Sequence, residues 1–285
     1  MAETTLRGFL RVAAAIPPVR VAHVRANAEA TLDLWRRADR DQVHIAWFPE
    51  LGLTGYTAGD LFHDTTLRAA ADDAVAWLAR TSLTEGLTPA IVVGLPVWTT
   101  LGAYNCAVAI HRGTVMAAIP KAYLPTYGEF YEARHFRTGR DVPPGAHADA
   151  PYDADACLIG TEICEDGWVA NTPAAHYAAA GALIVGNLSG SPLSVGRGEA
   201  RHRTCWKQSA PNLLGYVYAA AGPGESTADL AFDAHGMIYE AGTLLAESQR
   251  FAREAQLIVA DIDIDGLRRA RVRTGTFGDA ATAIT

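Results

Sequence analysis

Long apolar runs are missing from this sequence of 285 residues, and so are the usual signals for export. No segment approaches the about 18 to 20 uninterrupted apolar residues that a membrane-spanning helix needs. Residues 1–7 lack the charged-then-apolar order of a signal peptide. We therefore expect a cytoplasmic protein without a membrane partner.

Cysteine is scarce, and the basic residues do not cluster. The four cysteines have neither CxxC nor mixed Cys/His spacing, so we expect free thiols and no metal site. A formal net charge of −7 with scattered Lys and Arg argues against a nucleic-acid partner. The sequence has no Walker-type phosphate loop, and the Gly-Pro-Gly turn at 222–224 is not a dinucleotide fingerprint. It predicts no cofactor.

Apolar residues make up 49% of the chain, which is enough for a large core. Buried strands are expected over 9–16, 43–48, 90–95, 158–163, 182–188, 216–221 and 258–262, and helices over 27–37, 67–81, 172–180 and 198–215. Because hairpins interrupt the alternation of helices and strands, a layered α/β fold with two facing sheets between helices is predicted.

A hairpin and the C-terminal segment complete this expectation. The hairpin over 103–120 is apolar on both faces of both arms, so we expect it to lie between two layers. No stretch of the chain has the composition of a linker, which predicts a single domain over residues 1–285. Within it, residues 266–285 form a tail that is charged and then small, with nothing of its own to bury.

Three residues capable of chemistry each follow a buried strand: Glu50, Lys121 and Cys164. Alone, each has a plain structural explanation, as a surface acid, a snorkelling lysine and a small packed thiol. The carboxylates beside Cys164 should raise the pKa of its thiol, which makes a poor nucleophile unless a cation and a base lie nearby. Lys121 would supply the cation and Glu50 the base, so the set predicts nucleophilic catalysis by cysteine.

The motifs around these residues resemble the nitrilase (carbon–nitrogen hydrolase) superfamily. The matching stretches are FPELGLTGY at 48–56, PKAYLPTYGE at 120–129 and EICED at 162–166. More narrowly, the stretches at 129–132, 187–192 and 224–230 are similar to the glutaminase domain of glutamine-dependent NAD synthetases. The resemblance implies an α/β fold that is a four-layer αββα sandwich, and it implies homo-oligomers.

Carried over by motif, the resemblance implies a catalytic role for four residues. Glu50 would be the general base, Lys121 the cation that stabilises an oxyanion, and Cys164 the nucleophile. Glu129, eight residues after Lys121, matches the second glutamate, which orients the other groups. No metal or organic cofactor is implied.

The resemblance also implies residues that surround a glutamine-like substrate: Tyr56, Tyr127, Glu165 and Ser189. Arg197 is a further candidate, because its planar guanidinium suits a carboxylate. Phe130 is a candidate on the same loop as Tyr127, and packing within the loop is the alternative explanation for both aromatic residues.

The implied function is hydrolysis of the terminal carboxamide of glutamine, or of a glutamine-like small molecule, through a cysteine thioester that releases ammonia. Three alternatives stay open: a nitrile or N-carbamoyl hydrolase, an ammonia-supplying subunit of a separate synthetase partner, and a non-catalytic scaffold bound to such a partner. The NAD synthetases continue into an ATP-dependent domain, and this chain ends where that domain would begin. We therefore expect a free-standing amidase or glutaminase.

Overall fold

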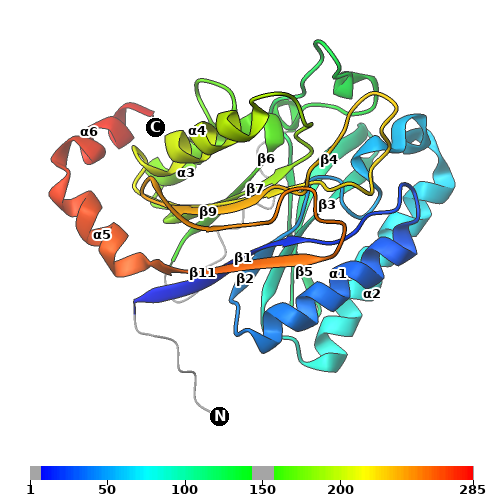
Figure 1. Cartoon of the computed structure of the whole chain (residues 1–285), viewed down its shortest axis with the longest axis horizontal. Helices are drawn as coiled ribbons and strands as arrows, with labels where there is room; N and C mark the ends of the chain where they lie inside the picture. Colours follow the sequence, from blue (N-terminus) through cyan, green and yellow to red (C-terminus); the bar gives the residue numbers. More distant parts are fainter. Residues whose placement is uncertain (1–7, 143–156, 285) are drawn as a thin grey trace.

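The computed structural model describes residues 8–142 and 157–284, and it contains two β-sheets that face each other (Figure 1). The first sheet has the strand order β11-β1-β2-β3-β4-β5, and the second has the order β10-β9-β8-β7-β6. The first is built from β1 (Phe9–Ile16), β2 (Ile45–Trp47), β3 (Ala90–Thr99), β4 (Gly102–His111), β5 (Thr114–Pro120) and β11 (Gln256–Asp263). The second is built from β6 (Ile159–Ile163), β7 (Ile184–Ser189), β8 (Gly215–Ala220), β9 (Gly236–Glu240) and β10 (Thr243–Glu247).

Helices cover the outer face of each sheet (Figure 1). The first sheet packs against α1 (Val24–Arg40) and α2 (Thr65–Glu85), and the second against α3 (Pro173–Ala179) and α4 (Arg197–Ser209). Three apolar clusters follow from this arrangement, one between the sheets and one under each pair of helices. The predicted four-layer αββα sandwich is confirmed.

Strand β1 shows why its sequence is almost continuously apolar. Val12, Ala14 and Ile16 belong to the cluster between the sheets, whereas Ala13 and Ala15 belong to the cluster under α1 and α2. Successive side chains of a strand point to opposite faces, and here both faces are buried. Apolar residues are therefore needed at every position from 12 to 16.

One contact sets how closely the two sheets approach. The indole N–H of Trp47 on β2 donates to Thr161 Oγ1 on β6 over 3.0 Å, so this buried polar group is paired. The same indole lies against Gly186 on β7, where an added Cβ would come within 2.0 Å of the Trp47 Nε1. Glycine at 186 is therefore required for the sheets to pack at this distance.

Helix α2 illustrates how the local sequence sets the ends of an element. It starts after Asp64, whose side chain accepts from the Thr66 amide, and ends at Gly86, which has a φ of +69°. Leu67 and Leu78 are buried against the first sheet. Within residues 8–142 and 157–284, no helix is both long and apolar enough to cross a bilayer.

The predicted hairpin exists as β4 and β5, but the expectation that both arms are covered on both faces was wrong for β5. This strand lies at the edge of the first sheet. Val115 and Met116 are exposed there, at 46% and 41% of their surface. Apolar composition alone does not distinguish an edge strand with scattered exposed residues from a central one.

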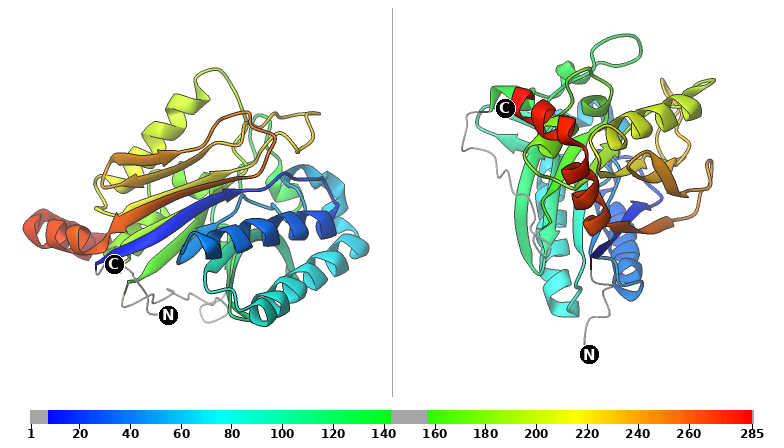
Figure 2. Two further views of the ribbon diagram at one scale, coloured as in Figure 1. Left: turned by 60° about the horizontal axis from the view of Figure 1, so that its bottom comes forward. Right: turned by 90° about the vertical axis from the view of Figure 1, so that its left-hand side faces the viewer.

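The C-terminal segment also differs from the expectation. It forms α5 (Ile264–Arg273) and α6 (Gly275–Ile284), which continue from β11 along one end of the sandwich (Figure 2). Leu267 is buried, and Phe277 packs against the cluster under α3 and α4. Arg271 donates to the backbone oxygens of Ala182 and Asn212. These few contacts fasten the segment, although its sequence shows no apolar face of usual width.

Candidate active site

Glu50, Lys121 and Cys164 lie together in the interior. Lys121 directly follows β5, Cys164 directly follows β6, and Glu50 follows β2 after Phe48 and Pro49. All three residues are at most 5% exposed. Lys121 Nζ lies 2.6 Å from Glu50 Oε1, and the charges of both residues act on the thiol of Cys164.

The carboxylate of Glu50 is held by donors on three different segments. Its Oε1 accepts from Lys121 Nζ and, over 2.7 Å, from Asn105 Nδ2 on β4. Its Oε2 accepts from the backbone N–H of Gly190, which follows β7, over 2.6 Å. A carboxylate with these three bonds has little freedom to rotate.

Gly190 must lack a side chain for this arrangement to exist. A Cβ at this position would come within 2.4 Å of the ring of Tyr56 and within 2.9 Å of Glu50 Oε2. The close approach lets the Gly190 amide reach the carboxylate. The loop after β7 and the loop after β2 are thereby joined at the site.

Lys121 is shared between two carboxylates. Besides Glu50, its Nζ donates to Glu132 Oε1 over 2.7 Å and to Glu132 Oε2 over 2.8 Å. Burial alone would lower the pKa of Lys121, but the charges of Glu132 and Glu50 outweigh burial and hold that pKa well above its usual value. The two carboxylates therefore favour the charged form of Lys121.

The second glutamate of the cluster is Glu132, and the assignment to Glu129 does not fit the structure. Glu132 opens the 3-10 turn η2 (Glu132–Arg134) and is 5% exposed. Glu129 is exposed on the preceding loop, and Lys121 makes its hydrogen bonds to Glu132. Glu132 turns inward because its carbonyl accepts from the amides of His135 and Phe136, two buried residues.

The backbone at Cys164 has an uncommon conformation. Its φ is +47°, at the point where β6 turns into the 3-10 helix η4 (Cys164–Gly167). Asp166 holds this turn, since its carboxylate accepts from the Ile163 amide over 3.0 Å and from the Tyr123 amide over 2.8 Å. The nucleophile turn is thus tied to the segment that follows Lys121.

The pKa of the Cys164 thiol lies above its ordinary value. Burial raises its pKa most, and Glu50 raises it further, while Lys121 acts in the opposite direction. A thiol beside a buried carboxylate can lose its proton to that carboxylate during attack, and no thiolate has to exist beforehand. The cluster therefore brings together groups that can serve as a nucleophile, as an acceptor for its proton and as a cation.

The acids that flank Cys164 have separate roles. Glu162 accepts from Asn187, from Tyr216 and from the amide of Ala174, so it joins β6 to the neighbouring strands and to α3. Glu165 accepts from the hydroxyl of Tyr127 over 2.7 Å. Glu165, unlike Glu162, is thus positioned toward the loop that carries Tyr127 and Phe130.

The predicted substrate residues are divided between the cluster and its surroundings. The hydroxyl of Tyr56 donates to Glu132 Oε1 over 2.8 Å and so belongs to the cluster around Lys121. Ser189 is buried beside Cys164 and lowers the pKa of its thiol. The guanidinium of Arg197 lies 5.4 Å from the ring centre of Trp168. Among the described residues, Ser189 Oγ and Arg197 Nε have no hydrogen-bond partner of standard geometry, although both are buried.

Tyr127, Glu165 and Arg197 lie near enough to affect one another. Burial and the contact with Glu165 raise the pKa of Tyr127 to about 12, with a further increase from Cys164 and a decrease from Arg197. Phe130 packs edge-on against Tyr127 with ring centres 5.8 Å apart. Both explanations for Phe130, packing and substrate contact, are compatible with this position.

A partly open cavity adjoins the cluster. It is bounded by parts of η1, η2 and the loop before β9: Leu51, Tyr56, Thr57, Gly59, Phe62, Glu129, Phe130, Tyr131, Glu132, His135, Phe136, Ser226, Ala228, Asp229 and Leu230. Tyr56 and Glu132 belong to both cavity and cluster. Cys164, Glu165, Ser189 and Arg197 do not line it, so the cavity touches the cluster from the side of Glu132.

Sequence reasoning missed Glu132, Asn105 and Gly190. Asn105 is a single amide within an apolar strand, and such a residue needs a buried partner. Glu132 lies in the same Glu-Phe-Tyr-Glu stretch as Glu129. The feature that distinguishes Glu132 from Glu129 is the pair of buried residues that follows it, His135 and Phe136, which place the turn against the core.

A family model described as carbon-nitrogen hydrolase matches residues 11–272 of this chain. Among curated proteins, the glutamine-dependent NAD(+) synthetase of Mycobacterium tuberculosis (strain ATCC 25618 / H37Rv) is 43% identical over 284 residues, covering 95% of this chain and 42% of the relative. The protein of the same name from Aquifex aeolicus is 26% identical over 244 residues, covering 84% of this chain and 41% of the relative. This chain thus spans less than half the length of these relatives.

Solved structures share the fold. The glutamine-dependent NAD+ synthetase from Acinetobacter baumannii, in complex with adenosine diphosphate, superposes with a TM-score of 0.80 at 26% identity, covering 91% of this chain and 46% of that one. An amidase from Nesterenkonia sp. superposes with a TM-score of 0.76 at 22% identity, covering 96% of this chain and 99% of that one. At this identity, the second likeness concerns the fold alone.

Proposed function

This chain belongs to the carbon-nitrogen hydrolase family, and from the geometry of its site we propose that it hydrolyses the terminal carboxamide of glutamine or a glutamine-like small molecule. Hydrolysis of a carbon–nitrogen bond is the chemistry of the family. The observation that carries the proposal is the buried cation of Lys121 between Glu50 and Glu132, beside Cys164.

The first step is attack of the thiol on the amide carbon. Glu50 takes the proton of Cys164 as the carbon–sulfur bond forms. Its carboxylate is already ordered by Asn105, Lys121 and Gly190, so proton transfer requires no rearrangement of the base. The raised pKa of Cys164 fits this concerted transfer, since a free thiolate would be poorly stabilised in the buried site.

The negative charge on the substrate oxygen develops near Lys121. Once Glu50 is protonated, it no longer holds Lys121 by charge, and the cation can act on the oxyanion. One donor of this kind contributes about 3–4 kcal/mol to the transition state. Glu132 keeps Lys121 in place during the step, which makes Glu132 a positioning residue.

Collapse of the tetrahedral intermediate releases the amine. Protonated Glu50 donates its proton to the leaving nitrogen, ammonia departs, and the acyl group stays on Cys164 as a thioester. A water molecule then attacks the thioester and gives its proton to Glu50. The proton returns to the thiol as the carboxylic acid product leaves, so the enzyme is restored.

The surroundings favour a substrate with an amino group and a carboxylate. Glu165 offers a negative charge for an ammonium group, and Arg197 offers a planar guanidinium for a carboxylate. Among the described residues, Ser189 Oγ and Arg197 Nε make no hydrogen bond of standard geometry, which suits polar groups of a ligand. The relatives with the highest identity given above are named as glutamine-dependent enzymes.

A synthetase partner is the second part of the proposal. The relatives are named NAD(+) synthetases, and this chain corresponds to 42% of such a protein. We propose that the released ammonia is consumed by a synthetase activity. Assembly of several copies of this chain remains a prediction.

The test measures ammonia and the acyl product. Purified protein is incubated with glutamine, with other ω-amides, and with matched nitrile and N-carbamoyl compounds. We expect glutamine or a close amide to give equal amounts of ammonia and carboxylic acid, and a glutamine-analogue electrophile to form an adduct on Cys164. Equal, slow ammonia release by wild type and Cys164→Ala would refute the proposal, and preferential turnover of the nitrile or carbamoyl compound would replace the substrate class.

A further inference from the structure

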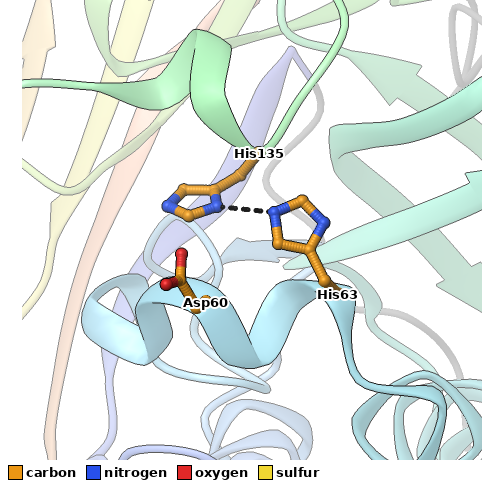
Figure 3. A group of neighbouring side chains, drawn as sticks. All are labelled: Asp60, His63 and His135. Carbon is orange, nitrogen blue, oxygen red and sulfur yellow. Dashed lines mark hydrogen bonds between the residues drawn. The ribbon is translucent and has the colours of Figure 1, made fainter.

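A second cluster of chemically active side chains lies outside the candidate active site, where the turn η1 (Tyr56–His63) meets η2 (Figure 3). Asp60 and His63 are on η1, and His135 directly follows η2. One ligand atom from each of the three residues lies within 4.8 Å of the other two. Two imidazoles and a carboxylate are a ligand set that Zn²⁺ and similar cations prefer.

The spacing of the two imidazoles suits a shared metal ion. His135 Nδ1 lies 3.2 Å from His63 Nε2. Two nitrogen ligands at about 2.0–2.1 Å from one tetrahedral zinc ion lie about 3.3–3.4 Å apart. Only one proton can lie between these nitrogens, so a metal ion can replace it after small rotations of the rings.

Asp60 is oriented toward the histidines by Arg134. The guanidinium donates to Asp60 Oδ1 over 3.0 Å and to Oδ2 over 2.9 Å. Each carboxylate oxygen retains a second lone pair, which a metal ion can use. A partner that orients a ligand in this way is usual around metal sites, although the positive charge of Arg134 will limit the affinity.

The cluster can be reached from outside. Asp60 and His63 are exposed, and His63 and His135 both line a surface hollow of about 780 Å³. His135 itself is 8% exposed, and its Nε2 has no hydrogen-bond partner among the described residues. A contact with His63 therefore accounts for Nδ1 of His135, but no hydrogen bond within the described part of the chain accounts for its buried Nε2.

Protein hydrogen bonds do account for another group of two histidines and an acid, which consists of His202, His235 and Glu247. In that group, Nε2 of His202 and Nε2 of His235 both contact Glu247 Oε1. Their remaining nitrogens lie against the hydroxyl of Tyr239 and the guanidinium of Arg201. All four nitrogens have partners, so this group serves as an internal control.

We propose that Asp60, His63 and His135 bind one divalent transition-metal ion of the Zn²⁺ class, with water as the fourth ligand. The ion would join the end of η1 to the end of η2. The starts of the same two turns are already joined, because Tyr56 donates to Glu132. A metal ion would thus brace the turn that carries Glu132.

The test uses tag-free protein with the substitution Cys164→Ala, which removes the buried thiol as a competing ligand. Titration with Co²⁺, followed by its visible absorption, and with Zn²⁺, followed by calorimetry, should show one binding equivalent. Adding His63→Ala should lower the affinity about 100-fold or more, and Asp60→Asn about 10-fold. His63 and Asp60 are exposed, so both variants are expected to fold.

Two further variants serve as controls. His176→Ala removes an exposed histidine on α3, and His202→Ala disrupts the control group. Both should bind metal as strongly as the Cys164→Ala protein. Zinc should also raise the melting temperature of that protein, and this increase should disappear with His63→Ala.

Three outcomes would overturn the proposal: no binding up to millimolar metal, binding unchanged by His63→Ala, or binding lost with His202→Ala. The titration needs no catalytic activity. Failure of the proposed amide hydrolysis would therefore leave this result unaffected, and the reverse also holds.

Discussion

Among residues 8–142 and 157–284, Arg201 and Lys121 are buried cations, and they differ in how their charge is matched. Arg201 on α4 is fully buried, and its donors contact Asp233, Ser191 Oγ and the backbone oxygens of Ser191 and Pro192. Lys121 is just as buried, but two carboxylates share it and a thiol lies beside it. Both clusters hold the fold together, but the charge of Arg201 faces one buried carboxylate and the charge of Lys121 faces two.

The difference between the two clusters helps to distinguish a cluster that stabilises the fold from one that can carry out chemistry. Around Arg201, every guanidinium nitrogen has a partner of standard geometry. Around Lys121, acidic groups exceed the cation, and the pKa values of Cys164 and Glu132 are raised by burial. Among the described residues, the nearby Ser189 Oγ and Arg197 Nε stay without partners. A bound ligand can supply hydrogen-bond partners to such polar groups. Their position near a thiol with a raised pKa is typical of a functional site.

The largest difference between the two clusters should appear when Lys121 and Arg201 are each replaced by methionine. Lys121→Met is expected to lower ammonia release about 10³-fold or more, because the oxyanion loses its cation. Arg201→Met should lower the free energy of unfolding by about 3–5 kcal/mol, because Asp233 stays buried with only the half-exposed Arg250 to pair it. Lys121→Met should cost less stability, since Glu132 can take up a proton.

Ammonia assays and urea unfolding of both variants measure the two effects. An Arg201→Met protein as stable as wild type would remove the structural half of the comparison. A Lys121→Met protein with normal turnover would remove the catalytic half.

The two glutamates of the loop after Lys121 provide the next contrast. Glu132→Gln should lower kcat about 100-fold, because the positioning charge on Lys121 is lost while the shape is kept. Glu129→Gln should change kcat less than about 3-fold, because Glu129 is exposed and only lines the adjoining cavity. Steady-state kinetics on the same amide decides between them, and a larger effect at Glu129 would restore the assignment made from the sequence.

The sequence predicted the layers and the main cluster because both depend on local pattern. Apolar periodicity located β1, whose predicted bounds of 9–16 agree with the structure, and it located both helix pairs. Glu50, Lys121 and Cys164 could be chosen because each is a polar residue at the end of an apolar run. Their proximity follows from strand ends that meet at one edge of the sandwich.

What the sequence could not supply depends on contacts between distant segments. Choosing Glu132 over Glu129 requires knowing which side of a short 3-10 turn faces the core. Gly190 matters only because the ring of Tyr56 lies against it. His63 and His135 are 72 residues apart on two irregular turns, so no motif spacing announces them.

Gly190→Ala should give an intermediate effect. The added Cβ would press on Tyr56 and on Glu50 Oε2, so the base must move by a few tenths of an ångström or more. We expect about a 10-fold loss of kcat and a decrease of about 1–3 kcal/mol in the free energy of unfolding. Gly278→Ala, on the exposed face of α6 with open space around it, is the matched control: it should leave kcat unchanged and raise the free energy of unfolding by about 0.5–1 kcal/mol, because alanine is the better helix former. Equal behaviour of the two variants would show that the approach of Gly190 to Glu50 is unimportant.

The smallest effect that we expect is a dependence of stability and turnover on pH, caused by the titration of Glu132 beside Lys121. Burial raises the pKa of Glu132 to about 7, and the charge of Lys121 opposes that shift only in part. The pKa of Glu132 is thus higher in the folded protein than in the unfolded chain. The protonated carboxyl of Glu132 adds its full stabilisation below the unfolded pKa of about 4.3. This stabilisation is lost as the pH rises through about 7.

Turnover should change in the opposite direction over the same range, because only the ionised Glu132 positions Lys121 fully. We therefore expect the free energy of unfolding to fall and kcat to rise between about pH 5 and 8. Both slopes should flatten in Glu132→Gln, measured by urea unfolding and by ammonia release at each pH. Unchanged slopes in that variant would assign the titration to another group of the cluster, with Cys164 as the next residue to test.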